Sequence, residues 1–424
     1  MTTTDPGALT AQAIEKHGSP ASVIDQAKGF FDDTVALRRK LHRNPELGNE
    51  LPITREILLE SLADLPLQLN LHKTTSGVVA VLEGDKPGDT VLLRGDMDAL
   101  PLHEDTGLDF ESSNMGTMHA CGHDTHVSML VGAARMLCER KSDINGRVMF
   151  MFQPGEEGFG GAQLMIDEGM LGNTTRKDGS ASPITGAYAL HITSSMPTGW
   201  FATKAGPVMA SADDMHIKVI GRGGHGSEPF RALDPIPIAC EIVQAFQTMV
   251  TRQINPFDPT VVSVCAIKAG TASNVIPEYA EIDGTIRAIS EATRGKVHDL
   301  IKQVAEGVAA AHGADVEVTV RRDYPVTVND ADKSEFMIEL ATTITGADNV
   351  FRLPNPVMGA EDFSFVLNKL PGAMMFLGAT PRNRDFSKAA PNHSNRVFFD
   401  EEAMINGMAV YATAALRHLG APLG

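Results

Sequence analysis

The sequence predicts an α/β protein: a mostly parallel sheet flanked by helices, with a smaller α+β domain inserted into it. Up to about residue 205, strand-like apolar runs alternate with helical periodicities at the spacing of βαβ units. After about residue 206 the order becomes β-α-β-β-α-β, the signature of a ferredoxin-like domain. A chain of 424 residues is also too long for one ordinary core. We therefore expect a main domain of residues 1–205 plus 322–424 and an inserted domain of residues 206–321.

The main domain is expected to begin with a helix, because apolar residues recur with helical periodicity from about residue 23 to residue 43. The apolar run at 90–93 leads into Asp96 and Asp98, and the run at 147–152 is stopped by Pro154 and Gly155. Both runs are typical of buried strands. Further strands are expected at 78–82 and 187–190, and further helices at about 124–137 and 162–170.

The inserted domain has the size of one small core. Its strands are expected at 215–220, 260–267, 280–289 and 315–321, and its helices at 235–253 and 290–312. The rest of the chain contains the sequences GAEDF at 359–363 and PNHS at 391–394, which we expect in loops of the main domain.

The composition excludes several classes of partner. A net charge of −17 argues against nucleic acid, whose phosphates need a basic surface. No basic amphipathic stretch and no apolar run of roughly 20 residues indicates a membrane. The first 28 residues carry no basic-then-apolar leader, and four cysteines are too few for a disulfide scaffold. We therefore expect a globular protein of the reducing cytoplasm.

Five side chains of metal-ligand type lie far apart in the chain, most of them after strand-like runs. Because the carboxyl ends of parallel strands meet at one edge of a sheet, we expect these side chains to converge. A thiolate, imidazoles and a carboxylate favour Zn²⁺, Mn²⁺ or Co²⁺ over Mg²⁺ or Ca²⁺. Five ligands are one too many for a closed tetrahedral site and suit two ions that share one ligand and a water. They are Cys121, His123, Glu157, His191 and His393.

Glu156 stands beside Glu157 and has no evident metal to bind. A spare carboxylate at such a site could take a proton from a metal-activated water as a general base and return it as an acid. Taken singly, these residues have ordinary explanations: a lone cysteine is usually an inert core residue, and a Glu-Glu pair is usually part of a solvated loop. Their conjunction at predicted strand ends favours a metal-dependent hydrolase.

Six motifs carry a resemblance to a known family. They are RGDMDALP at 94–101, MHACGHD at 118–124, GEEG at 155–158, GGHGS at 223–227, SNVIP at 273–277 and GAEDF at 359–363. In this order they resemble the M20 metallopeptidase family, and within it the amidohydrolase subfamily of hippurate hydrolases, N-acyl-amino-acid amidohydrolases and auxin-conjugate hydrolases. The resemblance runs from about residue 41 to residue 402.

The resemblance implies a catalytic domain with two divalent ions that cleaves the amide bond of N-acyl amino acids or related small conjugates. Cys121 would bridge the ions, and the other four ligands would complete the two coordination spheres. Glu156 would be the general acid/base, and Asp98 would orient a ligand or its loop without touching metal. Thr125, and Asn395 in place of the family's proline after His393-Ser394, depart from the family pattern, so we expect a differently shaped pocket and last-ligand loop.

The resemblance also implies that the inserted domain is a lid and joins two subunits into a homodimer. His225 would stabilise the oxyanion in the partner subunit's site, and Asn274 and Arg287 would hold the substrate carboxylate. A guanidinium suits that task because it binds a carboxylate through two parallel hydrogen bonds. The ordinary alternative for Arg287 is a surface charge at a strand end.

Three other functions remain open at this point. An exopeptidase or dipeptidase would use the same metal centre with a different pocket. A catalytically idle, metal-binding relative would have lost the base or a ligand, and neither is lost here. A thiol redox enzyme built on Cys121 is the weakest alternative, because no second cysteine lies close by in the sequence.

Overall fold

The computed structural model describes residues 5–423. The chain divides into two compact units, of which unit 1 comprises Met1–Gly206, Val328–Pro354 and Phe365–Gly424. Unit 2 comprises Pro207–Thr327 and Asn355–Ser364. The sequence placed the segment 355–364, which contains GAEDF, in the main domain, whereas the structure groups it with unit 2.

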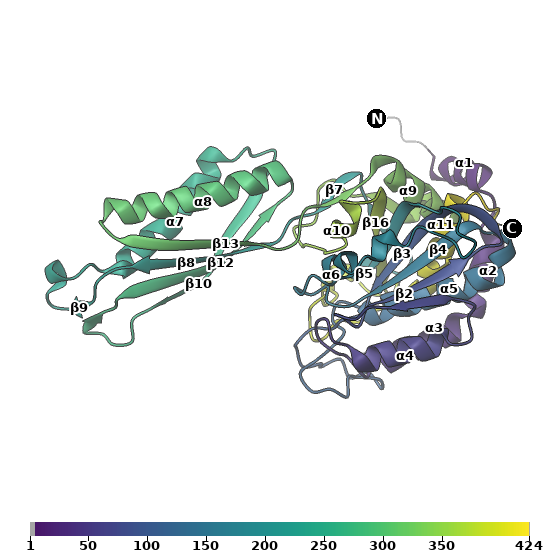
Figure 1. The fold of residues 1–424 in the computed structure, drawn as a ribbon, viewed down its shortest axis with the longest axis horizontal. Helices are drawn as coiled ribbons and strands as arrows, with labels where there is room; N and C mark the ends of the chain where they lie inside the picture. Colours follow the sequence, from purple (N-terminus) through teal and green to yellow (C-terminus); the bar gives the residue numbers. More distant parts are fainter. Residues whose placement is uncertain (1–4, 424) are drawn as a thin grey trace. The chain divides into compact units, whose positions relative to one another are not determined.

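Unit 1 is built on an eight-stranded sheet with the order β1-β2-β4-β3-β5-β16-β6-β15 (Figure 1). The four central strands, β4, β3, β5 and β16, are parallel to one another. On one side β2 and β1 continue the sheet antiparallel, and on the other side β6 is antiparallel to β16. The strands are β1 (Gln68–Leu71), β2 (Val78–Glu83), β3 (Lys86–Asp96), β4 (Asn145–Gln153), β5 (Ile184–Pro197), β6 (Phe201–Thr203), β15 (Val350–Arg352) and β16 (Gly372–Thr380).

The central strands are buried on both faces over most of their length, as their apolar runs predict. Helix α5 packs against β3, β4 and β5, and α11 packs against α5 and against β3, β5 and β16. The helices of unit 1 are α1 (Pro6–His17), α2 (Ala21–Gly29), α3 (Phe31–His42), α4 (Pro52–Leu62), α5 (His123–Glu139), α6 (Gly161–Asp167), α9 (Ala331–Thr345) and α11 (Ala403–His418); α10 (Ser364–Leu367) begins at the last residue of unit 2.

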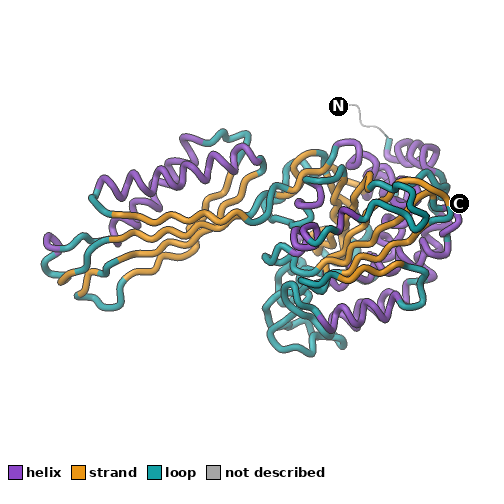
Figure 2. The backbone as a smooth tube through the Cα atoms, viewed as in Figure 1, coloured by secondary structure: helices purple, strands orange, loops and turns teal. Residues whose placement is uncertain are grey.

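Unit 2 contains the predicted ferredoxin-like arrangement. Its antiparallel sheet has the order β10-β12-β8-β13, and α7 and α8 pack against it (Figure 2). On β12 the buried Ile282 and Ile286 alternate with the partly exposed Asp283 and Arg287, so only one face of the strand is apolar. The elements are β8 (Asp213–Ile220), β9 (Gly224–His225), α7 (Pro235–Gln253), β10 (Thr260–Ala269), β11 (Val275–Ile276), β12 (Tyr279–Ala288), α8 (Glu291–Ala311) and β13 (Asp315–Arg322).

Three local predictions differ from the structure. The strand expected to end at His191 continues to Pro197, because β16 pairs with it beyond the end of β3. The helix expected to be capped by Asp124 or Thr125 begins at His123, after Gly122 turns the chain with φ 86°. A short pair of strands, β7 (Gly206–Met209) and β14 (Thr327–Asn329), was not expected.

No helix in residues 5–423 is both long enough and apolar enough to cross a membrane.

Candidate metal centre

The structure brings the five predicted ligands of unit 1 together near the carboxyl ends of β3 and β4. Cys121 precedes α5 and His123 is its first residue. His191 lies within β5, opposite Phe376 of β16, and His393 lies in the loop before α11. Glu157 follows β4, where Pro154 and Gly155 end the strand. The sheet edge therefore collects side chains that are far apart in the sequence.

The ligand atoms form two overlapping groups. Cys121, His123 and His191 form one and Cys121, Glu157 and His393 the other, with the ligand atoms of each group within 4.8 Å of one another. The Cys121 Sγ lies 3.4 Å from His191 Nε2, and His393 Nε2 lies 3.3 Å from Glu157 Oε1. Because Cys121 belongs to both groups, its sulfur occupies the position that a bridging ligand needs.

The hydrogen bonds around two imidazoles leave one nitrogen of each directed at this centre. His123 Nδ1 lies 2.8 Å from the Asp98 carbonyl, and His191 Nδ1 lies 2.7 Å from the Ile192 carbonyl. The remaining His123 Nε2 is buried and has no hydrogen-bond partner. Buried polar atoms normally have partners, and metal-bound histidines normally donate their other nitrogen to a carbonyl or carboxylate. These residues therefore fit a divalent cation of the zinc class.

The protonation equilibria also indicate a site that attracts positive charge. Burial, and then the Glu157 carboxylate, raise the pKa of the Cys121 thiol. The contacts of His393 with Cys121 and then with Glu157 raise the pKa of this imidazole to about 10. The negative groups that raise the pKa of His393 would also attract a metal cation into the same space.

Asp98 holds the turn that carries the paired glutamates. Its Oδ1 accepts the Glu156 N–H at 2.9 Å and its Oδ2 accepts the Glu157 N–H at 3.0 Å. Gly155 has φ 67°, and a Cβ there would lie 2.1 Å from Asn49 Oδ1, so glycine is required. The turn leaves the Glu156 side chain 7% exposed, with Oε2 4.0 Å from His123 Nε2.

The His393 loop is tied to both other ligand segments. The His393 N–H donates to the Ala120 carbonyl at 2.9 Å. The Asn392 amide donates to the carbonyls of Cys121 and Ile192 at 3.3 and 3.0 Å. His393 has φ 70°, which non-glycine residues adopt infrequently, so this network imposes the conformation that directs its ring towards Glu157.

The three remaining predicted residues, His225, Asn274 and Arg287, lie in unit 2. His225 on β9 pairs with Val275 on β11, and the adjacent Gly226 N–H donates to the Asn274 carbonyl at 2.8 Å, so His225 and Asn274 are neighbours. His225 Nδ1 accepts the Ser227 N–H at 3.1 Å. Arg287 lies separately, on the polar face of β12.

The sequence reasoning missed a buried set of charged residues around the start of α5. Asp124 Oδ2 accepts from Arg38 Nε at 2.9 Å and from His42 Nδ1 at 2.8 Å. His42 Nε2 lies 3.1 Å from Glu104 Oε1. Asp124 follows His123 in the first turn of α5, so the bonds to Arg38 and His42 fix the part of the helix that carries this candidate ligand. The available signal was the position of Asp124 next to His123 and the spacing of Arg38 and His42 by one helical turn.

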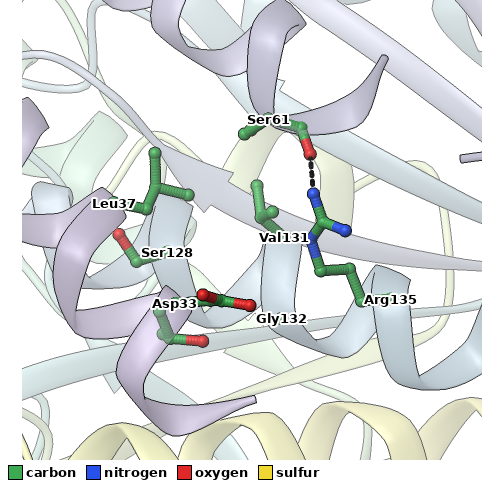
Figure 3. A pocket seen from close by; sticks show the side chains of 8 residues that line it. Asp33, Leu37, Ser61, Ser128, Val131, Gly132 and Arg135 are labelled. Carbon is green, nitrogen blue, oxygen red and sulfur yellow. Dashed lines mark hydrogen bonds between the residues drawn. The ribbon is translucent and has the colours of Figure 1, made fainter. Parts of the chain in front are cut away.

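A pocket of about 310 Å³ between α3, α4 and α5 is a separate feature (Figure 3). None of the predicted site residues lines it. Its guanidinium, Arg135, already donates to the Ser61 carbonyl and the Asp64 carboxylate. We assign no catalytic role to this pocket.

Comparisons with known proteins agree with this geometry. Residues 92–417 match the model of peptidase family M20/M25/M40. Thermostable carboxypeptidase 2 of Saccharolobus solfataricus is 38% identical over 397 residues, covering 93% of this chain and 97% of that protein. Hippurate hydrolase of Campylobacter jejuni is 34% identical over 383 residues, covering 90% and 96%.

A solved structure is similar throughout. The crystal structure of a dinuclear metal binding peptidase of the M20 family from Bacillus subtilis superposes with a TM-score of 0.78 at 30% identity, covering 93% of this chain and 99% of that one. The α/β fold and the resemblance seen in the motifs are therefore confirmed. This chain belongs to peptidase family M20/M25/M40 and is a metal-dependent hydrolase of amide bonds.

Proposed function

We propose that this protein cleaves the amide bond between an acyl group and the nitrogen of an amino acid. The observation that carries the proposal is the convergence of five ligand-type side chains with Glu156 beside them. Hippurate and a peptide C-terminus, which the names of two relatives specify, share this bond and a free carboxylate. We further propose that two divalent ions bind per chain and that these ions are zinc, manganese or cobalt.

Glu156 would move the proton during the reaction. Its carboxylate would accept a proton from the attacking water and deliver it to the departing nitrogen. Divalent ions held by the five ligands would supply Lewis acidity, which polarises a carbonyl and lowers the pKa of water. Asp98 would position both glutamates, because its carboxylate accepts the backbone N–H groups of Glu156 and Glu157 and so fixes the turn that carries them.

Unit 2 would recognise the substrate. Arg287 and Asn274 would hold the free carboxylate, and the Arg287 guanidinium is available on the polar face of β12. We also propose that unit 2 serves as the lid and dimerisation domain of a cytoplasmic homodimer. The catalytic domain would then correspond to residues 1–205 plus 322–424, without the segment 355–364 that groups with unit 2.

The proposal is tested by measuring metal content together with substrate range. We expect about two divalent ions per chain by mass spectrometry, and turnover of N-acetyl or N-benzoyl amino acids after metal reconstitution. The matched control is the corresponding N-acyl amino acid amide, which has the same scissile bond and no carboxylate. Because a hydrogen bond to a charged group contributes about 1.5–3 kcal/mol, the amide should react at least about tenfold less efficiently. Failure to bind metal under reducing conditions would contradict the proposal.

An exopeptidase that acts on dipeptides is the second candidate, and the carboxypeptidase relative at 38% identity favours it. It would use the same ligands and the same base. Rates on dipeptides measured beside rates on N-acyl amino acids decide between the two, because only the pocket for the acyl or aminoacyl group differs.

The role of His225 leads to a further prediction. If this imidazole stabilises the oxyanion in the partner subunit's site, then Glu156→Gln and His225→Ala homodimers should each be inactive. Mixing them with subunit exchange should restore up to about a quarter of wild-type activity per subunit, because each mixed dimer then contains one site with both residues intact. If mass spectrometry verified the subunit exchange and no activity were recovered, His225 would not act in the partner subunit's site.

A further inference from the structure

A second group of buried ionisable residues lies directly behind the candidate metal centre. Asp96, at the end of β3, and His126, in the first turn of α5, are both fully buried, and Arg94 is 1% exposed. Burying such groups is costly unless every hydrogen-bonding position is satisfied. None of these three residues is a predicted ligand, and none takes part in the proposed proton transfer. Their burial therefore needs a separate explanation.

The hydrogen bonds of His126 determine which of its nitrogens carries the proton. The backbone N–H of Ile192 points at His126 Nε2 at 2.7 Å, and a backbone N–H can only donate. Nε2 is therefore the acceptor and carries no proton. Nδ1 lies 2.5 Å from Asp96 Oδ1, so it carries the proton and donates it to this carboxylate. Arg94 donates to the other oxygen, Asp96 Oδ2.

This arrangement excludes His126 as a metal ligand, although Asp96, His123 and His126 lie close enough together to suggest one. Both ring nitrogens of His126 are occupied, and both oxygens of Asp96 already accept hydrogen bonds. Asp96 and His126 can therefore influence the centre by positioning the predicted ligands and the backbone that they contact.

The neighbour that connects the pair to the centre is the backbone of Ile192. Its N–H is held by His126, and its carbonyl accepts from His191 Nδ1 at 2.7 Å. The His191 ring is thereby turned so that Nε2 faces Cys121 Sγ at 3.4 Å. The His126 ring also packs against His191, with ring centroids 4.9 Å apart, and stacks on His123 at 5.4 Å. One buried imidazole thus contacts two of the predicted ligands.

We propose that His126 is a positioning residue for the metal centre: Asp96 fixes its tautomer, and the unprotonated Nε2 fixes the Ile192 backbone that orients His191. This proposal rests on the proposed function, because it gives His191 the role of a ligand. In this role His126 would keep His191 Nε2 unprotonated and directed at the centre in the metal-free protein. Residues that orient ligands in this way typically change metal affinity by 10- to 100-fold.

Two substitutions of His126 separate the two hydrogen bonds. A glutamine amide oxygen reaches about as far as imidazole Nε2, so His126→Gln can still accept the Ile192 N–H. An asparagine amide is shorter, so His126→Asn can donate to Asp96 but leaves the Ile192 N–H without a partner. We expect His126→Asn to weaken zinc binding by about 10- to 100-fold in competition with a chromophoric chelator, and His126→Gln by only a few-fold. Equal losses in the two folded variants would overturn the proposal.

A second measurement uses metal-free protein and is independent of activity. In ¹⁵N-histidine spectra of the 14 histidines, His126 and His191 of the wild type should both show the Nδ1–H tautomer. The His191 signal should keep this tautomer in His126→Gln and lose it in His126→Asn. An Nε2–H tautomer for His126 in the wild type would overturn the proposal even if a variant failed to fold.

The Glu156→Gln variant distinguishes the proposed amide hydrolysis from the positioning role of His126. It should lose activity while zinc affinity and the His191 tautomer stay at wild-type values. If the wild type bound zinc in this way but cleaved no N-acyl amino acid, the proposed substrate would be wrong and the positioning role of His126 would stand.

Discussion

Replacing Glu156 with glutamine is expected to lower kcat by about 10²- to 10⁴-fold, the range that a positioned general acid–base contributes. The amide has the size of the carboxylate but accepts no proton from water at neutral pH. The turn should persist, because Asp98 binds the backbone N–H of residue 156 and not its side chain. Metal content should therefore stay at the wild-type value, and KM should change little. Steady-state kinetics and mass spectrometry on the same preparation measure both.

Glu157→Gln is the matched control, because the two residues are adjacent and the same Asp98 carboxylate holds both. Glu157 Oε1 lies 3.3 Å from His393 Nε2, within the group that includes Cys121, so this substitution should lower metal occupancy. Activity of Glu157→Gln should recover in part at high metal concentration, whereas that of Glu156→Gln should not. A Glu156→Gln variant that retains near wild-type turnover with metal bound would remove Glu156 from the proton-transfer role.

The sequence predicts the central architecture well because local and long-range signals coincide there. The strand that leads into Asp96 and the strand that ends at Gln153 contain short continuous apolar runs, which are typical of strands covered on both faces in a parallel sheet. The convergence of Cys121 and Glu157 follows from the same topology. The candidate ligands could be named from short sequence motifs alone, whereas their proximity depends on the fold.

The extension of β5 beyond His191 shows what the sequence leaves out. That part of the strand exists because β16, more than 180 positions later, pairs with it: Phe376 lies opposite His191 and Thr380 opposite Pro197. The run GAMMFLGAT of β16 is as apolar as the other central strands, but no strand is predicted for it in the sequence analysis above. A strand partner so far along the chain has no local signature.

The buried charges were missed for a different reason. Arg38 and His42 lie one helical turn apart on α3, which is an amphipathic helix, and charged residues at such a spacing usually belong to its solvated face. Asp124 turns that face inward by binding both side chains. Only the three-dimensional structure brings Glu104, from the long loop after β3, to the same place.

Replacing Asp124 with asparagine is expected to lower the free energy of unfolding of the metal-free protein by about 3–5 kcal/mol, the cost of breaking a buried ion pair. The substitution keeps the shape but removes the charge that the buried Arg38 Nε–H contacts, and Arg38 then pairs with Glu401 alone. Asp64→Asn is the matched control, because Asp64 pairs with Arg135 on the surface at 2.9 Å and its side chain is 65% exposed. That pair should contribute no more than about 1 kcal/mol. Urea unfolding at pH 6 measures both.

The pH dependence of the same measurement separates charge from packing. Burial lowers the pKa of His42, but Asp124 and Glu104 outweigh this effect and raise the pKa to about 8. With an unfolded value of about 6.5, the stability that His42 contributes is fully present below about pH 6.5 and is lost as the pH rises through about 8. The wild type and Asp64→Asn should therefore lose about 2 kcal/mol more than Asp124→Asn between pH 6 and pH 9. Parallel profiles for all three proteins would show that Asp124 supports α5 through shape alone.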